Sequence, residues 1–301
     1  MYKKVGISIE NLQVEYGLLQ AIEMAKKVGA DAVDIALFNN DYRDDASIYS
    51  KSDEEIYSFY EKARERAKQL GIEISQTHGR IRGYGNDFKE NKTIKENARK
   101  DCIATYALGA PVCVMHGAST NVLGPDISPE LMRKINFDMF CDVISFAKEY
   151  NIQIATETLG DAPNFNCCSF FGDIDEFVRS YDEVCSSDNN APFFSVCMDT
   201  GHCHKAVKYG QPEVGDMIRR LGKSISVLHL HDNNSFADQH QVPFTGTIDW
   251  IDVMAALKET DYNGVYNLEL SLGKFGRGLE LEYAEFSIKV LRNLLEEQSD
   301  A

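Results

Sequence analysis

The sequence predicts a single α/β domain, a (β/α)8 TIM barrel that extends over residues 1–301. Eight short apolar runs typical of buried strands begin about 30 to 40 residues apart, which leaves room for one strand and one crossover helix in each unit. The segments between these runs carry helical periodicity. An open, doubly wound sheet would usually show a glycine-rich nucleotide turn after its first strand, and this chain has IENLQVEYG there instead.

The order of strand-like and helix-like segments supports the barrel along the whole chain. The expected strands are 5–9, 32–37, 72–77, 112–116, 152–158, 193–199, 225–231 and 264–270. The clearest helical segments are 16–30, 54–71 and 128–150, and the first two end at or next to a glycine, as helices often do. Ser128, Asp173 and Asp249 are expected N-caps or first-turn residues.

Composition limits the class of protein. A chain of 301 residues that is 44% hydrophobic can bury a large core, and we find no apolar run long enough to span a membrane. The net charge of −16 disfavours nucleic acid as a partner. Eight cysteines, several inside apolar runs and none in a CxxC pair, suggest reduced thiols. We therefore expect a cytoplasmic protein.

Histidines gather where a barrel places its active site. Nearly all of them end strand-like runs or follow such an end, His240 lies in a loop, and none falls in a segment that we expect to be helical. The active site of a (β/α)8 barrel lies at the carboxyl ends of its strands. The histidines are His78, His116, His202, His204, His229, His231 and His240.

Three acids, Glu157, Asp199 and Glu269, also end strands. In each of these strands the bulky apolar residues alternate with the set that ends in the acid, so the acids face the barrel axis. Converging carboxylates are costly unless a cation compensates them. Adding His229 yields a ligand set that suits one divalent ion, Mn²⁺, Mg²⁺, Co²⁺ or Zn²⁺. His231 shares the parity of His229 and is the alternative ligand.

Several motifs occur together in a set order. They are E-T at Glu157, D-T-G-H from Asp199 to His202, H-L-H-D-N from His229 to Asn233, D-Q-H from Asp238 to His240, and the late Glu269. With these motifs the chain resembles the xylose isomerase-like barrels, a superfamily of sugar isomerases and epimerases, inosose dehydratases and endonuclease IV-type enzymes.

The resemblance implies a divalent-metal-dependent sugar isomerase or epimerase, with manganese as the expected ion. Its metal ligands would be Glu157, Asp199, His229 and Glu269. Glu157 and Glu269 would also act as the acid/base pair, and His202 would contact substrate hydroxyls. The expected further contacts to a carbohydrate substrate are His78, His116, Asp238 and His240, with Lys274 and Arg277 as a candidate phosphate site after the last strand.

Other functions stay open. Ser235 stands where the epimerases carry an arginine, and Phe244–Gly246 reads F-T-G instead of G-E-G, which leaves room for a lyase acting on a related keto-sugar. An endonuclease IV-type zinc phosphodiesterase is the second alternative. The positions matching its trinuclear cluster include His78, His116, Asp238 and His240, and a modestly basic stretch runs from Arg80 to Lys100. A barrel acting as a sugar-binding or accessory subunit is the non-catalytic alternative, and a homo-oligomer is possible.

Overall fold

The computed structural model describes residues 2–297, and its centre is a barrel of eight parallel strands. The strands are β1 (Val5–Ser8), β2 (Ala32–Ala36), β3 (Glu73–His78), β4 (Val112–Met115), β5 (Gln153–Glu157), β8 (Phe194–Asp199), β9 (Ile225–His229) and β10 (Tyr266–Leu268). They pair in the order β10-β1-β2-β3-β4-β5-β8-β9. A parallel bridge between Leu230 and Leu268 joins the two ends of this order and closes the barrel. All eight expected strands are confirmed.

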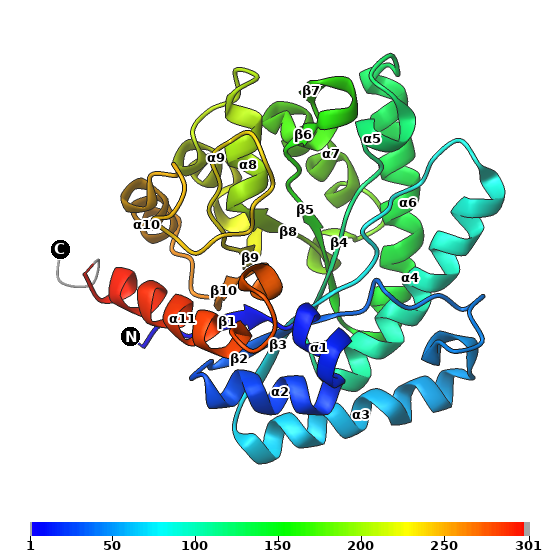
Figure 1. Ribbon diagram of the computed structural model, residues 1–301. Helices are drawn as coiled ribbons and strands as arrows, with labels where there is room; N and C mark the ends of the chain where they lie inside the picture. The colour runs from blue at the N-terminus through cyan, green and yellow to red at the C-terminus, as the bar shows by residue number, and fades with distance from the viewer. Residues whose placement is uncertain (1, 298–301) are drawn as a thin grey trace.

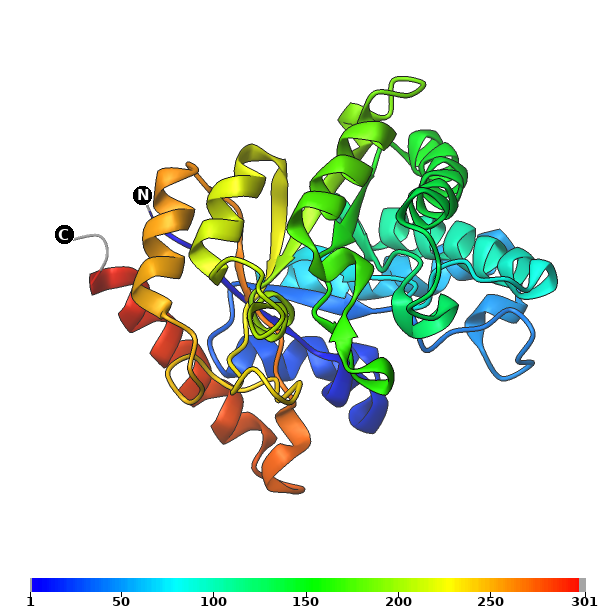
Figure 2. The same cartoon turned by 90° about the horizontal axis from the view of Figure 1, so that it is seen from above.

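Helices surround the strands (Figures 1 and 2). The α-helices are α1 (Glu10–Tyr16), α2 (Leu18–Lys27), α3 (Asp53–Leu70), α4 (Phe88–Leu108), α5 (Thr120–Leu123), α6 (Pro129–Tyr150), α7 (Ile174–Cys185), α8 (Thr200–Val207), α9 (Val214–Leu221), α10 (Trp250–Glu259) and α11 (Glu280–Glu297). The 3-10 helices are η1 (Ile48–Ser50), η2 (Pro163–Phe165), η3 (Phe170–Gly172), η4 (Ala191–Phe193), η5 (Gly222–Ser224) and η6 (Leu272–Phe275).

The helix boundaries follow the capping signals of the sequence, with two corrections. Ser128, Asp173 and Asp249 each accept backbone N–H hydrogen bonds at a helix start. The helix expected over 16–30 is wrong at its start, because Gly17 adopts φ 83° and separates α1 from α2. The expectation that no histidine is helical is also wrong, since His202 and His204 lie in α8.

The barrel interior holds a small apolar cluster below the site. Its members are Val112, Val114, Ala155, Cys197 and Val227. Ala155 and Cys197 have the same strand parity as Glu157 and Asp199, so these acids point along the axis above the cluster, as the alternation predicts. Residues of the opposite parity, such as Ile154 and Val196, pack in the main core between the strands and the helices.

One insertion interrupts the regular alternation of strands and helices. A short antiparallel hairpin of β6 (Asp161–Ala162) and β7 (Cys167–Cys168) follows β5. Asp161 is buried and pairs with Lys205 at 2.9 Å and Lys208 at 2.7 Å, which ties the hairpin to α8. All eight cysteines are free thiols. Within residues 2–297, none of the helices combines the length and the apolar character needed to cross a bilayer.

Candidate metal centre and active site

The acids and histidines singled out from the sequence meet at the carboxyl ends of the strands. Glu157, Asp199 and His229 are the last residues of β5, β8 and β9, and Glu269 directly follows β10. His78 ends β3, and His116 follows β4 by one residue. His202 comes from the first turn of α8, where Asp199 serves as N-cap and accepts the His202 N–H at 2.6 Å. Asp238 and His240 lie on the loop between β9 and α10.

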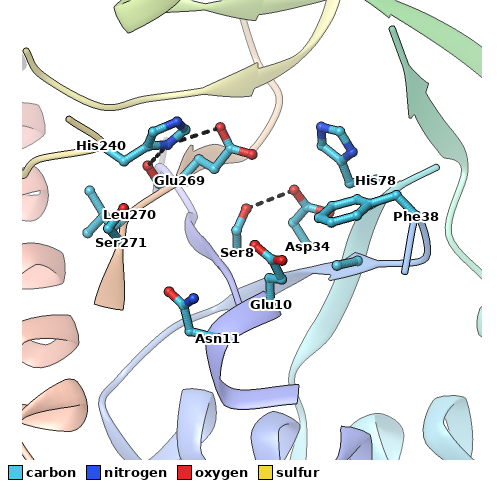
Figure 3. A pocket seen from close by; sticks show the side chains of 11 residues that line it. Ser8, Glu10, Asn11, Asp34, Phe38, His78, His240, Glu269, Leu270 and Ser271 are labelled. Atoms are coloured by element: carbon cyan, nitrogen blue, oxygen red, sulfur yellow. Dashed lines mark hydrogen bonds and ion pairs between the residues drawn. The ribbon is translucent and has the colours of Figure 1, made fainter. Parts of the chain in front are cut away.

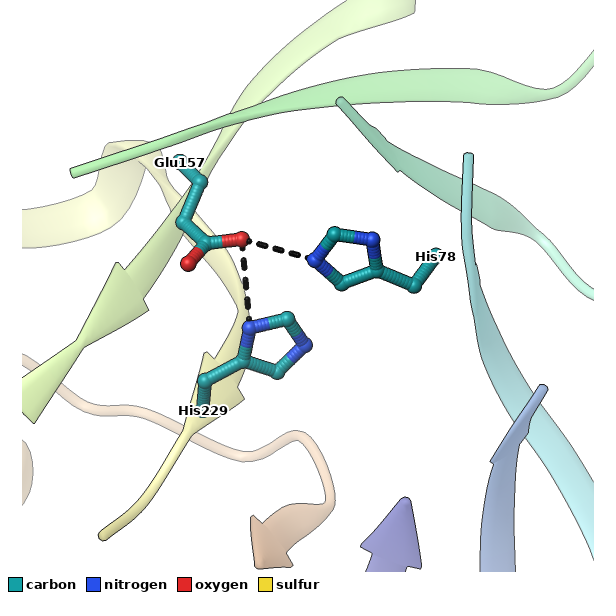
Figure 4. Close-up of side chains that lie close together, drawn as sticks. All are labelled: His78, Glu157 and His229. Atoms are coloured by element: carbon teal, nitrogen blue, oxygen red, sulfur yellow. Dashed lines mark hydrogen bonds and ion pairs between the residues drawn. The ribbon is translucent and has the colours of Figure 1, made fainter. Parts of the chain in front are cut away.

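Glu157 is the centre of this cluster. Its Oε2 lies 3.1 Å from His78 Nε2, 3.2 Å from His116 Nε2 and 3.2 Å from His229 Nδ1, and Figure 4 shows two of these contacts. Its Oε1 lies 3.0 Å from His202 Nδ1. Burial raises the pKa of Glu157, but the imidazoles, led by His116 and His229, outweigh burial and hold this pKa well below its usual value. Glu157 is therefore a carboxylate anion at neutral pH.

The orientation of His229 indicates a cation site. Its Nε2 lies 3.1 Å from Asp34 Oδ2, and a carboxylate only accepts, so Nε2 carries a proton. The other nitrogen, Nδ1, makes no hydrogen bond to any described residue. It faces three carboxylates, at 3.2 Å from Glu157, 3.6 Å from Glu269 and 4.0 Å from Asp199.

This arrangement fits a divalent ion by its charge and by its donors. Burial lowers the pKa of His229, but Cys197, Glu269 and Glu157 together raise it well above its usual value. The cluster thus attracts positive charge, which a proton or a metal ion can supply. Three carboxylate oxygens and one imidazole nitrogen within 4.8 Å of one another suit the ions expected from the sequence. Asp34 would hold the histidine as an outer-shell partner.

A second set of side chains that could hold a metal ion, His202, Asp238 and His240, lies on the side of His202 away from Glu157. His202 Nε2 and His240 Nε2 lie 3.3 and 3.5 Å from Asp238 Oδ2. The Nδ1 atoms of both rings face backbone carbonyls, that of Thr158 at 3.1 Å and that of Glu269 at 3.2 Å. Since a carbonyl only accepts, both Nδ1 atoms carry protons and both Nε2 atoms are turned toward the carboxylate. Burial lowers the pKa of His240, and Asp238 and Glu269 raise it to about 9.

Sequence reasoning missed one residue of the site and left the place of another open. Asp34 was missed. It lies inside the apolar run AVDIAL and alternates with the small residues Ala32 and Ala36, a pattern that could have indicated a side chain facing the barrel axis. His231 does not replace His229 beside Glu157. Its Nε2 pairs with Asp199 Oδ1 at 3.0 Å, and its ring stacks on that of His240 at 3.9 Å.

The loop that carries Asp238 and His240 is anchored by Asp232. This buried carboxylate accepts hydrogen bonds from Trp250 Nε1 at 2.9 Å and from the backbone N–H groups of Asn233, Gly246 and Ile248. Gly246 leaves no room for a side chain, because a Cβ there would lie 2.3 Å from Asp232 Oδ1. The contacts of Asp232 therefore fix both ends of this loop.

A pocket of about 130 Å³ opens beside the cluster (Figure 3). Its lining residues are Ser8, Glu10, Asn11, Asp34, Ala36, Phe38, His78, His240, Glu269, Leu270 and Ser271. The structure does not bring Lys274 and Arg277 to it. Lys274 borders a separate surface cavity, and Arg277 is 89% exposed and pairs with Glu15 at 3.0 Å.

The fold and this strand-end site define a family. The chain belongs to the xylose isomerase-like TIM barrel family, whose model matches residues 22–294.

Individual relatives are distant. Uncharacterized protein y4fM of Sinorhizobium fredii is 29% identical over 170 residues, which is 56% of this chain, and the chain spans only 50% of the length of that protein. An inosose isomerase of Bacillus velezensis is 24% identical over 267 residues, 84% of this chain and 83% of that protein. A D-tagatose 3-epimerase-like protein of known structure superposes with a TM-score of 0.74 at 20% identity, covering 99% of this chain and all of that one (100%). Likeness at this level establishes the fold.

Proposed function

We propose that the protein is a divalent-metal-dependent sugar isomerase or epimerase that moves a proton on the carbon next to a carbonyl group. The observation that carries this proposal is a pair of carboxylates, Glu157 and Glu269, that share one histidine nitrogen at 3.2 and 3.6 Å. The inosose isomerase and the tagatose epimerase-like protein among the similar proteins support the reaction class.

The metal would be held by the four residues expected from the sequence: Glu157, Asp199, His229 and Glu269. When bound, a divalent ion supplies Lewis acidity to the carbonyl and hydroxyl oxygens of a sugar, which acidifies the C–H between them. Manganese is our first choice of ion, with magnesium, cobalt or zinc as alternatives.

The two glutamates differ in access, which divides their roles. Glu269 lines the pocket and its side chain is 19% exposed, so it can reach a substrate and remove the proton. Glu157 lies deeper, with a side chain 1% exposed, and His78 and His116 hold its carboxylate in place. We assign it the return of the proton. His202 would present its ring to substrate hydroxyls from the side of Asp238.

The test is exchange of the substrate proton with D₂O. A panel of ketoses, aldoses, inososes and keto-glycosides is incubated with metal-loaded protein, and deuterium uptake is followed by NMR. We expect Glu269→Gln to lose at least about 100-fold in exchange rate, since general acid–base groups contribute that much. Glu282→Gln, on the exposed face of α11, is the control. Full exchange in a metal-loaded Glu269→Gln variant would remove Glu269 from this role, and eliminated products would indicate the lyase.

A second candidate, phosphodiester hydrolysis by several zinc ions, is favoured by one observation. More than one set of side chains could hold a metal ion. Glu157 belongs to a second such set with His78 and His229, and a further set contains His202, Asp238 and His240. Against it, the net charge is −16, and members of the basic stretch are paired with acids: Arg80 with Asp101, Lys95 with Asp142 and Arg99 with Asp53.

Counting metal ions per chain by anomalous scattering separates the two candidates. One ion bound by Glu157, Asp199, His229 and Glu269 supports the isomerase. Three zinc ions that reach His78, His116 and His240 would contradict it.

A further inference from the structure

We propose that the pocket beside the carboxylate cluster receives the non-reacting, hydroxyl-bearing end of an unphosphorylated sugar, and that Glu10 selects against phosphorylated sugars. This inference rests on the proposed function and deepens it by naming the substrate class. The pocket adjoins the reacting groups because Glu269 and His78 belong to both the pocket and the cluster.

The walls of the pocket come from four neighbouring strands of the barrel, β10, β1, β2 and β3, and the segments that follow them, with His240 added by the loop after β9. Figure 3 shows Glu269 and His240 on one side, Asp34 and Phe38 on the opposite side, and Glu10 at the start of α1 between them. Phe38, with Ala36 and Leu270, adds apolar surface for the C–H groups of a sugar. One end of a bound sugar would therefore lie at Glu269 and the other toward Glu10.

The pocket is acidic. Glu10, Asp34 and Glu269 line it, and no lysine or arginine among residues 2–297 does. Each of the two lining histidines pairs with a further acid, His78 with Glu157 and His240 with Asp238, so these pairs add no net positive charge to the pocket. Lys274 and Arg277, the candidate phosphate site of the sequence, do not line the pocket.

Two acids of the pocket have oxygen atoms that can accept hydrogen bonds from a ligand. Asp34 is 1% exposed, and its Oδ1 has no hydrogen-bond partner among the described residues. Glu10 accepts a long hydrogen bond, 3.5 Å from Asn39 Nδ2 to its Oε1. Both are acceptors. A hydroxyl group can donate to them, whereas a phosphate dianion offers only acceptors and adds like charge. The pocket therefore favours the free sugar over its phosphate ester.

The experiment compares matched pairs of substrates. D-fructose and D-tagatose are tested against their 6-phosphates by D₂O exchange, and sorbitol against sorbitol 6-phosphate by calorimetric binding, which requires no turnover. We expect the free forms to be preferred by about 100-fold or more in kcat/KM and in affinity, because like charges placed together are strongly disfavoured.

Two substitutions assign this preference to Glu10. Glu10→Lys should reduce the preference for the free sugar over its phosphate ester by about tenfold or more. Glu10→Gln should reduce this preference less, because the amide keeps an acceptor but loses the charge. The control is Glu23→Lys on α2, which changes the net charge equally but lies on the outer surface, paired with Arg66. Circular dichroism of each variant verifies the fold.

The outcomes are distinguishable. Equal or better use of the phosphate esters by the wild-type protein, or an unchanged preference in Glu10→Lys, overturns the inference while leaving the isomerase proposal in place. Conversely, if no sugar exchanges protons but sorbitol binds with the expected preference over its phosphate, the proposed reaction fails and the pocket inference stands.

Discussion

Replacing Asp34 with asparagine tests whether the proposed metal centre depends on a carboxylate behind its histidine. Asp34 Oδ2 accepts from His229 Nε2 at 3.1 Å and from Ser8 Oγ at 2.8 Å, and it lies 3.4 Å from Gln76 Nε2. Asp34 and His229 are both almost completely buried. Asparagine has nearly the same shape, so the change removes the charge and leaves the packing intact.

The expected magnitude follows from this geometry. Asp34 holds Nε2 of His229, whereas the other ring nitrogen, Nδ1, faces Glu157, Asp199 and Glu269. Loss of the contact with Asp34 therefore lowers the basicity of Nδ1 and leaves the ring less firmly oriented. Outer-shell partners of this kind are worth about 10- to 100-fold in metal affinity. That range corresponds to about 1.4 to 2.7 kcal/mol at 25 °C.

The assay is a competition titration of Mn²⁺ and Zn²⁺ against a chelator, with wild-type and Asp34→Asn proteins in parallel. Ser8→Ala is the matched control, because it removes a donor to the same carboxylate but keeps the acceptor for His229. We expect that control to stay within about threefold of wild type. Unfolding in excess chelator tests the apoprotein fold. A folded Asp34→Asn protein that binds both ions as tightly as wild type would refute the reasoning.

Two further predictions concern positioning and pH. Asp232→Asn leaves at least one buried N–H without its acceptor, so it should lower the free energy of unfolding by about 1–3 kcal/mol. Urea unfolding followed by the fluorescence of Trp250, the single tryptophan, measures this, and an unchanged midpoint would argue against the anchor. Burial raises the pKa of Asp161, but Lys208 and Lys205 outweigh burial and lower it. A lowered folded-state pKa contributes stability above the unfolded-state pKa that is lost as pH falls through the folded value. Asp161→Asn should therefore destabilise the protein at about pH 7 and progressively less toward about pH 3, and an equal effect at both would contradict the ion pair.

The sequence by itself determined the barrel and the direction of its acids. Strand alternation has a period of two and is a local property, so the parity of Ala155 and Cys197 was enough to point Glu157 and Asp199 toward the axis. Parallel strands also share one carboxyl end, which brought residues from distant segments together. Helix starts at Ser128, Asp173 and Asp249 were equally readable, because a cap acts on its own first turn.

Only the tertiary structure decided how these residues pair. His229 and His231 have the same parity, yet one ring faces Glu157 and the other turns to Asp199 and stacks on His240. Asp34 lies 195 residues away from the histidine that it holds. Such choices depend on ring rotation and on contacts across the barrel, which no local pattern encodes. For the same reason, the sequence offered Lys274 and Arg277 as a candidate phosphate site, but only the packed barrel shows that Glu10 lines the pocket beside the acids and that these two residues do not.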